Sequence, residues 1–95
     1  METPPMTERR HVHYSGNVQG VGFRYTARSI ATGHDVTGYV KNLRDGRVEL
    51  IVEGARIEIA SLLREIQTEL GRHIREVHET SMPATGEFTQ FEVRY

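Results

Sequence analysis

The sequence predicts a single α+β domain in which two helices cover one face of an antiparallel sheet. The chain has 95 residues, which is enough for one compact core and too few for two. Alternating apolar residues, typical of half-buried strands, surround two stretches in which apolar residues recur at helical spacing. The resulting order is β-α-β-β-α-β with a short extra strand at the C-terminus. That order is the ferredoxin-like, split βαβ arrangement.

The N-terminal part of the chain contributes a lead-in, a strand and a helix. Polar residues and a Pro-Pro pair fill residues 1–10, which we interpret as a disordered lead-in. The folded domain is then expected over residues 11–95. Alternation predicts the first strand over residues 11–17. The first helix is expected from residue 23 to about residue 33.

Two strands joined by a tight turn follow. They are predicted over residues 36–42 and 47–53, and Asp45-Gly46 between them is expected to supply the left-handed positions of a hairpin turn. Strand 47–53 alternates apolar and charged residues, so one of its faces is expected to be buried. Ile51 is the one apolar residue on its other face.

The C-terminal part supplies the second helix and two strands. The helix is predicted over residues 55–70, with Gly71 as the left-handed residue that ends it. Its apolar stripe, suited to packing on a sheet, consists of Ile59, Leu62, Leu63, Ile66 and Leu70. A weakly patterned fourth strand is expected over residues 73–82, a loop over 83–89, and the short last strand over 91–95.

Composition excludes several classes of function. The formal net charge is -1, so no global positive field attracts nucleic acid or an anionic membrane. The chain contains no cysteine, which excludes disulfides and thiolate metal sites. No apolar run approaches the length of a spanning helix, and residues 1–10 lack the apolar core of a signal peptide. We therefore expect a cytoplasmic protein with neither nucleic acid nor membrane as a partner.

A glycine-rich loop between the first strand and the first helix is the main candidate for a binding site. Gly16, Gly20 and Gly22 fall within seven residues, and Arg24 follows in the first helical turn. Glycine allows positive φ and close approach of the backbone to a ligand. The N–H groups of such a loop and of the following helix can point at an anion. A cation in the first turn opposes the helix dipole, and an anion between them removes that conflict.

The same loop also has simpler interpretations. The glycines can serve the shape of a turn alone, and Arg24 can form a surface salt bridge. Nucleotide motifs fit poorly. A P-loop requires Lys-Ser/Thr after its last glycine, and none follows Gly20 or Gly22 here; the dinucleotide fingerprint requires Gly-x-Gly-x-x-Gly, whereas the spacing here is Gly16-x-x-x-Gly20-x-Gly22. The loop therefore indicates a small phosphate, held by backbone and one arginine, rather than a nucleotide.

Asn42 is expected to meet this loop in space. In the predicted fold, the first two strands run parallel with the third between them, so both end at the same edge of the sheet. Their backbones are then about 10 Å apart, and Arg24 and Asn42 can reach one small ligand. An asparagine amide both donates and accepts hydrogen bonds. The alternative for Asn42 is an ordinary residue before a turn, and the role of Gln19 stays unassigned.

Five histidines invite a metal interpretation. His11 and His13 share one face of the first strand, but the spacing of the sequence shows no third ligand. Solvent-facing histidines are the simpler interpretation, so no metal site is predicted. No Ser-His-Asp or Cys-His set is identifiable either, and a covalent nucleophile has no candidate.

Two stretches of this sequence resemble the signatures of a known family. Gly16-x-Val18-Gln19-Gly20-Val21-x-Phe23-Arg24 resembles the first signature of the acylphosphatases. Gly38-Tyr39-Val40-Lys41-Asn42, followed by Gly46, Val48 and Gly54, is similar to the second. The ending Phe91-Glu92-Val93-Arg94-Tyr95 is also similar to that of the family, so the resemblance covers residues 9–95.

The resemblance implies an enzyme that hydrolyses the carboxyl-phosphate bond of small acyl phosphates. It implies no cofactor, a monomer, and inorganic phosphate or sulfate as product-like ligands. Arg24 and Asn42 would be catalytic, with Asn42 orienting the attacking water. Residues expected to bind the phosphate are Gly16, Asn17, Val18, Gln19, Gly20, Val21, Gly22 and Arg24. The alternative is a non-catalytic phosphate-binding or regulatory module on the same ferredoxin-like fold.

Overall fold

The computed structural model describes residues 7–95. Residues 1–6 of the expected lead-in lie outside this range, whereas residues 7–10, assigned to the same lead-in, belong to the first strand. The elements in chain order are β1 (Thr7–Gly16), α1 (Phe23–Ala31), β2 (Val36–Asn42), β3 (Val48–Ala55), α2 (Arg56–Leu70), the 3₁₀ helix η1 (Gly71–His73), β4 (Ile74–Pro83) and β5 (Phe91–Arg94). The predicted order of strands and helices is confirmed.

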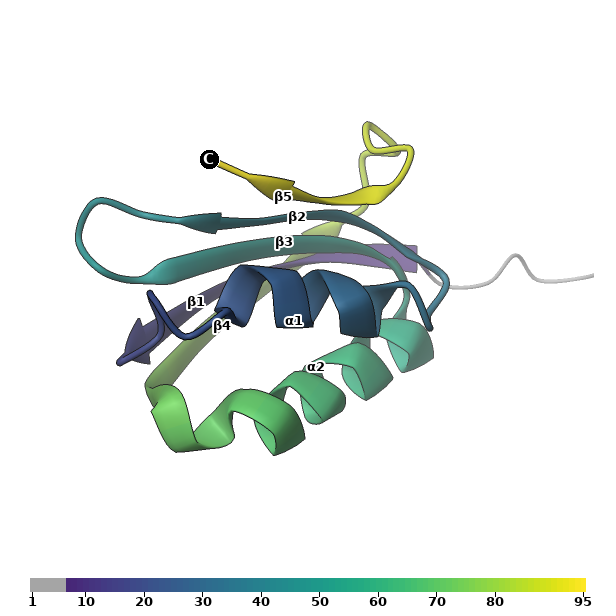
Figure 1. Cartoon of the computed structure of the whole chain (residues 1–95). Coiled ribbons are helices and arrows are strands. Elements are labelled where there is room, and N and C mark those ends of the chain that lie inside the picture. Colours follow the sequence, from purple (N-terminus) through teal and green to yellow (C-terminus); the bar gives the residue numbers. More distant parts are fainter. Residues whose placement is uncertain (1–6) are drawn as a thin grey trace, which may run out of the picture.

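The five strands form one sheet in the order β4-β1-β3-β2-β5 (Figure 1). β1 is antiparallel to β3 and to β4, and β2 is antiparallel to β3. β5, however, runs parallel to β2, so the sheet is mixed rather than purely antiparallel as predicted. β4 ends at the same end of the sheet as the one where β2 begins. The chain leaves β4 at that end and then lies beside β2, so β5 must run in the same direction as β2.

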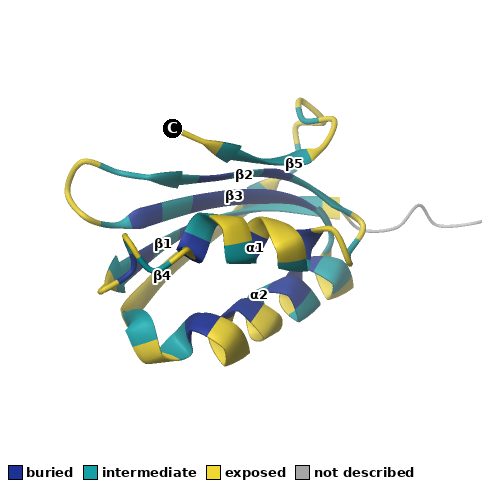
Figure 2. Ribbon diagram, viewed as in Figure 1, coloured by how far each residue is buried: buried dark blue, intermediate teal, exposed yellow. Residues whose placement is uncertain are grey.

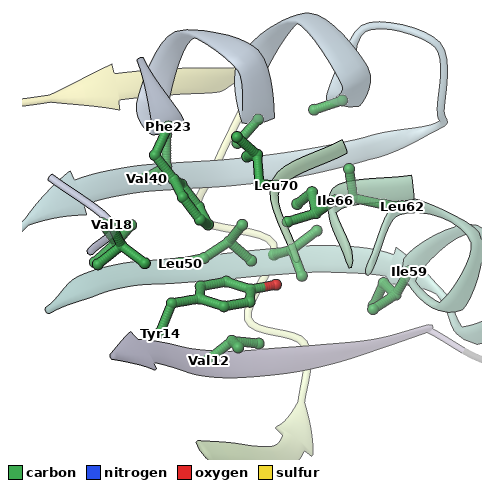
Figure 3. Close-up of a cluster of buried hydrophobic side chains, with 14 residues drawn as sticks. Val12, Tyr14, Val18, Phe23, Val40, Leu50, Ile59, Leu62, Ile66 and Leu70 are labelled. Carbon is green, nitrogen blue, oxygen red and sulfur yellow. The ribbon is translucent and has the colours of Figure 1, made fainter. Parts of the chain in front are cut away.

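Both helices pack on the same face of the sheet, and the core lies between them and the strands (Figures 1 and 2). The inward side chains of β3 are fully buried, as their alternation predicted: Val48, Leu50 and Val52. Four residues of the apolar stripe of α2 are buried against them: Ile59, Leu62, Ile66 and Leu70. Burial of each such side chain contributes about 1.5–3 kcal/mol. Figure 3 shows side chains of the helices and strands converging in this cluster.

The opposite face of the sheet carries a polar network. Ile51 lies on this face and is nevertheless only 5% exposed. Glu53, 4% exposed, accepts hydrogen bonds from Arg9 Nε at 2.7 Å and from the N–H groups of Thr85 and Gly86, both at 2.9 Å. The loop between β4 and β5 is thereby held against the sheet.

Two turn residues, Asp45 and Gly71, differ from their predicted roles, whereas Gly46 is left-handed as predicted. In the turn after β2, only Gly46 has a positive φ (+95°), so Asp45 is not left-handed. The turn closes with bonds from Leu43 N–H to the Arg47 carbonyl (2.8 Å) and from Gly46 N–H to the Leu43 carbonyl (3.2 Å), a geometry that requires a single left-handed residue. Gly71 has a φ of −56°, because α2 continues directly into η1 and needs no reversal there.

Candidate active site

The loop of residues 17–22 connects the end of β1 to the start of α1. Gly16, Gly20 and Gly22 have φ angles of +126°, +80° and +75°, which residues with a side chain rarely adopt. Gly22 is the N-cap of α1, and its carbonyl accepts the bond from Thr26 N–H at 3.0 Å. Each glycine of the motif therefore has a conformational reason.

Two side chains fix this loop in place. Val18 is fully buried and belongs to the same apolar cluster as Phe23 (Figure 3). Gln19 Nε2 donates to the carbonyls of Leu43 (2.7 Å) and Arg47 (3.0 Å). The side chain of Gln19 thus ties the loop to the β2–β3 hairpin. The sequence gives no signal for this role, because the partners lie 24 and 28 residues away and follow no local pattern.

The backbone of the loop offers several hydrogen-bond donors. In the part of the chain that the structure describes, the N–H groups of residues 17–22 donate neither to turn or loop carbonyls nor to side chains. The first N–H groups of α1 follow directly and also lack intrahelical partners. Such groups bind an anion favourably, since the positive end of the helix dipole adds to their partial charges.

Arg24 lies in the first turn of α1. Its Nη1 donates to the Arg94 carbonyl at 3.1 Å, and its guanidinium carbon is 4.6 Å from the ring centroid of Tyr95. Arg24 forms no ion pair within residues 7–95, so the surface salt bridge considered as its alternative role is not observed. The hydroxyls of Tyr25 and Tyr95 are hydrogen-bonded to each other. The C-terminal residues therefore lie against Arg24, which no sequence signal indicated.

Asn42 ends β2 on the side of the sheet that faces the helices. It follows the fully buried Val40 by two positions and pairs with Val48 of β3. Its side-chain oxygen Oδ1 is buried and accepts no hydrogen bond within the described residues. A buried acceptor without a donor is unfavourable by about 1–3 kcal/mol. Lys41, its neighbour, pairs with Glu49 and lies on the opposite face of the sheet.

Arg24 and Asn42 line the same pocket, which has a volume of about 290 Å³. β1 and β2 bring their ends together as predicted, because Tyr14 and Asn42 both pair with Val48 from opposite sides. Of the described residues that line the pocket, Arg24 alone is charged. The lining residues are Val18, Gly20, Gly22, Phe23, Arg24, Tyr25 and Asn42.

The chemistry of this pocket suits a small oxyanion next to a water molecule. A guanidinium offers a rigid fork of donors that matches two phosphoryl oxygens. The buried Asn42 oxygen can accept a hydrogen bond from a water or from a protonated ligand atom. The fold and the pocket together define a small α+β domain with a candidate anion site at the start of a helix.

Comparison with known proteins identifies the family. The family model described as acylphosphatase matches residues 10–93. An acylphosphatase of Caldanaerobacter subterraneus is 36% identical over 89 residues, which span 93% of this chain and 99% of the relative. The chain therefore belongs to the acylphosphatase family, and it is an acylphosphatase enzyme.

Solved structures agree with this assignment. The structure of an acylphosphatase from Coxiella burnetii matches with a TM-score of 0.84 and 32% identity, over 98% of this chain and 100% of that one. A structure of full-length HypF in its phosphate- and nucleotide-bound form matches with a TM-score of 0.83 and 25% identity. That match covers 100% of this chain but 13% of the HypF chain.

Neither helix within residues 7–95 has the length and apolar character needed to cross a bilayer.

Proposed function

We propose that the pocket lined by Arg24 and Asn42 is the catalytic centre of this acylphosphatase. The loop of residues 16–22 and the Arg24 guanidinium would hold the phosphoryl oxygens of a small acyl phosphate. Asn42 would orient the attacking water. One observation carries this proposal: the side chains of Arg24 and Asn42 line the same pocket with unused bonding capacity. Within residues 7–95, the buried Asn42 Oδ1 accepts no hydrogen bond and the Arg24 guanidinium forms no ion pair.

The proposed reaction is the hydrolysis of the carboxyl-phosphate bond. The water oxygen bonds to phosphorus while the bond between phosphorus and the acyl oxygen breaks. The acyl group leaves as a carboxylate, and the second product is inorganic phosphate. The proton lost by the water passes to a phosphate oxygen or to solvent. Because a carboxylate is a good leaving group, positioning and charge stabilisation can supply most of the catalysis.

The composition of the pocket supports a mechanism without a strong general base. Its described lining contains neither histidine nor a carboxylate, the residues that most often act as bases. One guanidinium and the loop N–H groups would stabilise the charge that develops on the phosphoryl oxygens. The amide oxygen of Asn42 would accept a hydrogen bond from the water, and this bond would aim a lone pair of the water oxygen at phosphorus.

A modest pocket volume favours a compact substrate. About 290 Å³ lies at the lower end of the range for small-molecule sites, so the phosphoryl group and a short acyl chain fill it.

We further expect a monomeric, cytoplasmic enzyme, and analytical ultracentrifugation and cell fractionation would test these two properties.

The second candidate function is a non-catalytic phosphate-binding or regulatory module. The similarity to one segment of the much longer HypF chain is the observation that keeps it in view. Hydrolysis of a synthetic acyl phosphate such as benzoyl phosphate by the purified protein distinguishes the two. We expect turnover that phosphate inhibits competitively. Phosphate binding without turnover would instead support the module.

A further inference from the structure

Three side chains with metal-binding chemistry meet on the sheet face that lies away from the helices. Val12 and Tyr14 of β1 are buried in the core, so His11 and His13, which alternate with them, lie on the other face. Glu49 of β3 pairs with His13 across the two strands and lies on the same face. The pocket lined by Arg24 and Asn42 includes none of these three residues.

The three side chains are already close to the geometry of a metal site. His11 Nε2 is 2.9 Å from Glu49 Oε2, and His13 Nε2 is 3.7 Å from the same oxygen. One ligand atom from each residue lies within 4.8 Å of the other two. Tetrahedral ligands at zinc distances of about 2.0–2.1 Å are about 3.3 Å from one another. Small side-chain rotations would therefore bring the three atoms around one ion.

A neighbouring hydroxyl orients the carboxylate. Tyr39 of β2 donates a hydrogen bond from its hydroxyl to Glu49 Oε1 at 2.9 Å, which leaves Oε2 facing the two imidazoles. Hydrogen bonds of this kind to a ligating carboxylate are typical of metal sites, because they fix the ligand before the ion binds. The side chains of His11, His13 and Glu49 are 28%, 18% and 17% exposed, so they are packed yet accessible to an ion from solvent.

We propose that His11, His13 and Glu49 form a binding site for a divalent transition ion, with Zn²⁺ as the best match. Two imidazoles and one carboxylate suit zinc and its neighbours, whereas Mg²⁺ and Ca²⁺ prefer a shell of oxygen ligands. The fourth position of the ion is taken by water. The ion would join β1 to β3 on the face opposite the catalytic pocket, so its effect is on stability rather than on the reaction.

Sequence spacing alone could not reveal this site, since the third ligand is 38 residues from His11. Only the pairing of β1 with β3 brings Glu49 beside both histidines. The binding energy adds to folding stability, because the unfolded chain lacks the assembled ligand set.

Calorimetric titration of Zn²⁺ into the untagged full-length protein tests the proposal. An oligohistidine tag must be absent because it binds the same ions. At a pH of about 7.5, where imidazole is neutral, we expect a single equivalent to bind and to raise the melting temperature. Co²⁺ in place of Zn²⁺ should give visible absorption bands characteristic of a low-symmetry, four-coordinate site.

Three single substitutions and one control locate the ion. His11→Gln, His13→Gln and Glu49→Gln should each weaken Zn²⁺ affinity at least tenfold. His34→Gln is the matched control, because His34 also lies beside two carboxylates, those of Glu58 and Glu65, and should leave the affinity unchanged. Circular dichroism confirms that each variant is folded.

Several results would overturn the proposal. They are the absence of Zn²⁺ binding by the parent, an unchanged affinity in the three variants, or an equal loss in His34→Gln. None of these results bears on the catalytic pocket. Hydrolysis of benzoyl phosphate by the metal-free parent and by the Glu49→Gln protein, measured in parallel, tests the proposed reaction separately.

Discussion

Arg24 and Asn42 line one pocket although Arg24 lies in α1 and Asn42 in β2, and β1, which leads into α1, does not pair with β2. Arg24 begins the helix that follows β1, and Asn42 ends β2. β3 lies between the two strands and pairs antiparallel with both, which places their ends at the same edge. Arg24 is a cation, and Asn42 offers an acceptor that has no hydrogen bond within residues 7–95, so binding and chemistry can be separated by mutation.

Arg24→Ala should abolish both phosphate binding and turnover. The substitution removes a charge-assisted, two-pronged contact to the phosphoryl oxygens, and kcat/KM should fall by at least about 10²-fold. The melting temperature should change little, because the guanidinium packs on the exposed Tyr95 ring and bonds the Arg94 carbonyl outside the core. Arg24→Lys is the matched control, because it keeps the positive charge and loses the forked pair of donors. Its activity should lie between those of the parent and Arg24→Ala. Unchanged phosphate affinity in Arg24→Ala would place the anion elsewhere.

Asn42→Ala should lower kcat by about 10²–10³-fold while phosphate affinity stays within a few-fold of the parent. The water's orientation matters only on the way to the transition state, so ground-state binding persists. Stability should not fall and should rise by up to about 1–3 kcal/mol, because the substitution removes a buried oxygen that accepts no hydrogen bond within residues 7–95.

Asn42→Asp is a sharper variant of the same test. It keeps the shape of the side chain but adds negative charge, so phosphate binding should weaken as well. Steady-state kinetics with phosphate as inhibitor measures both quantities. If Asn42→Ala weakens phosphate binding as much as Arg24→Ala does, Asn42 belongs to the anion cradle and does not position the water.

Gln19→Ala should reduce activity through the shape of the loop. It removes two hydrogen bonds to the carbonyls of Leu43 and Arg47, and the free energy of unfolding should fall by about 1–3 kcal/mol. A loosened loop presents its N–H groups less well, so phosphate affinity and kcat should fall together. Urea denaturation and inhibition kinetics check both effects. A variant with parental stability and activity would show that these two bonds do not hold the loop.

Glu53 should make folding stability depend on pH in the acid range. Burial by itself would raise the pKa of Glu53, but hydrogen bonds from Thr85, Arg9 and Gly86 outweigh it and hold this pKa below its ordinary value. The unfolded pKa is about 4.3, so the contribution is fully present above that pH. It is lost as the pH falls through the lower, folded pKa.

Glu53→Gln should therefore lower the free energy of unfolding by about 1–3 kcal/mol near neutral pH. The difference from the parent should shrink as the pH falls below the unfolded pKa of about 4.3, and it should be lost below the folded pKa, where Glu53 of the folded parent is also neutral. Urea unfolding of both proteins across this range gives the comparison. A difference that is constant with pH would show that the Glu53 charge does not stabilise the loop between β4 and β5.

Chelation should leave the hydrolytic rate unchanged. The described lining of the pocket holds no histidine, cysteine or carboxylate to bind an ion beside the phosphoryl group. Removal of the ion proposed between β1 and β3 should lower the melting temperature only. The check is benzoyl phosphate hydrolysis before and after exhaustive treatment with a chelator. An activity that disappears and returns with one divalent ion would contradict the mechanism.

Features that depend on near neighbours along the chain could be predicted from the sequence. Alternation and helical spacing predicted the strands and helices, and the glycines of the loop marked positive φ angles that the structure contains. Two motifs indicated the acylphosphatase family, which the comparisons then showed. The predicted parallel course of β1 and β2 was enough to expect that Arg24 and Asn42 meet.

Contacts between distant segments became visible only in the folded domain. The partners of Gln19, the position of Tyr95 against Arg24 and the meeting of Glu49 with His11 and His13 all depend on how the strands and loops pack. The parallel direction of β5 depends on where β4 ends. A periodic pattern shows which face of an element is buried, because burial repeats along that element. It cannot show which residue of another strand lies opposite, since that pairing is set by the packing of the whole domain.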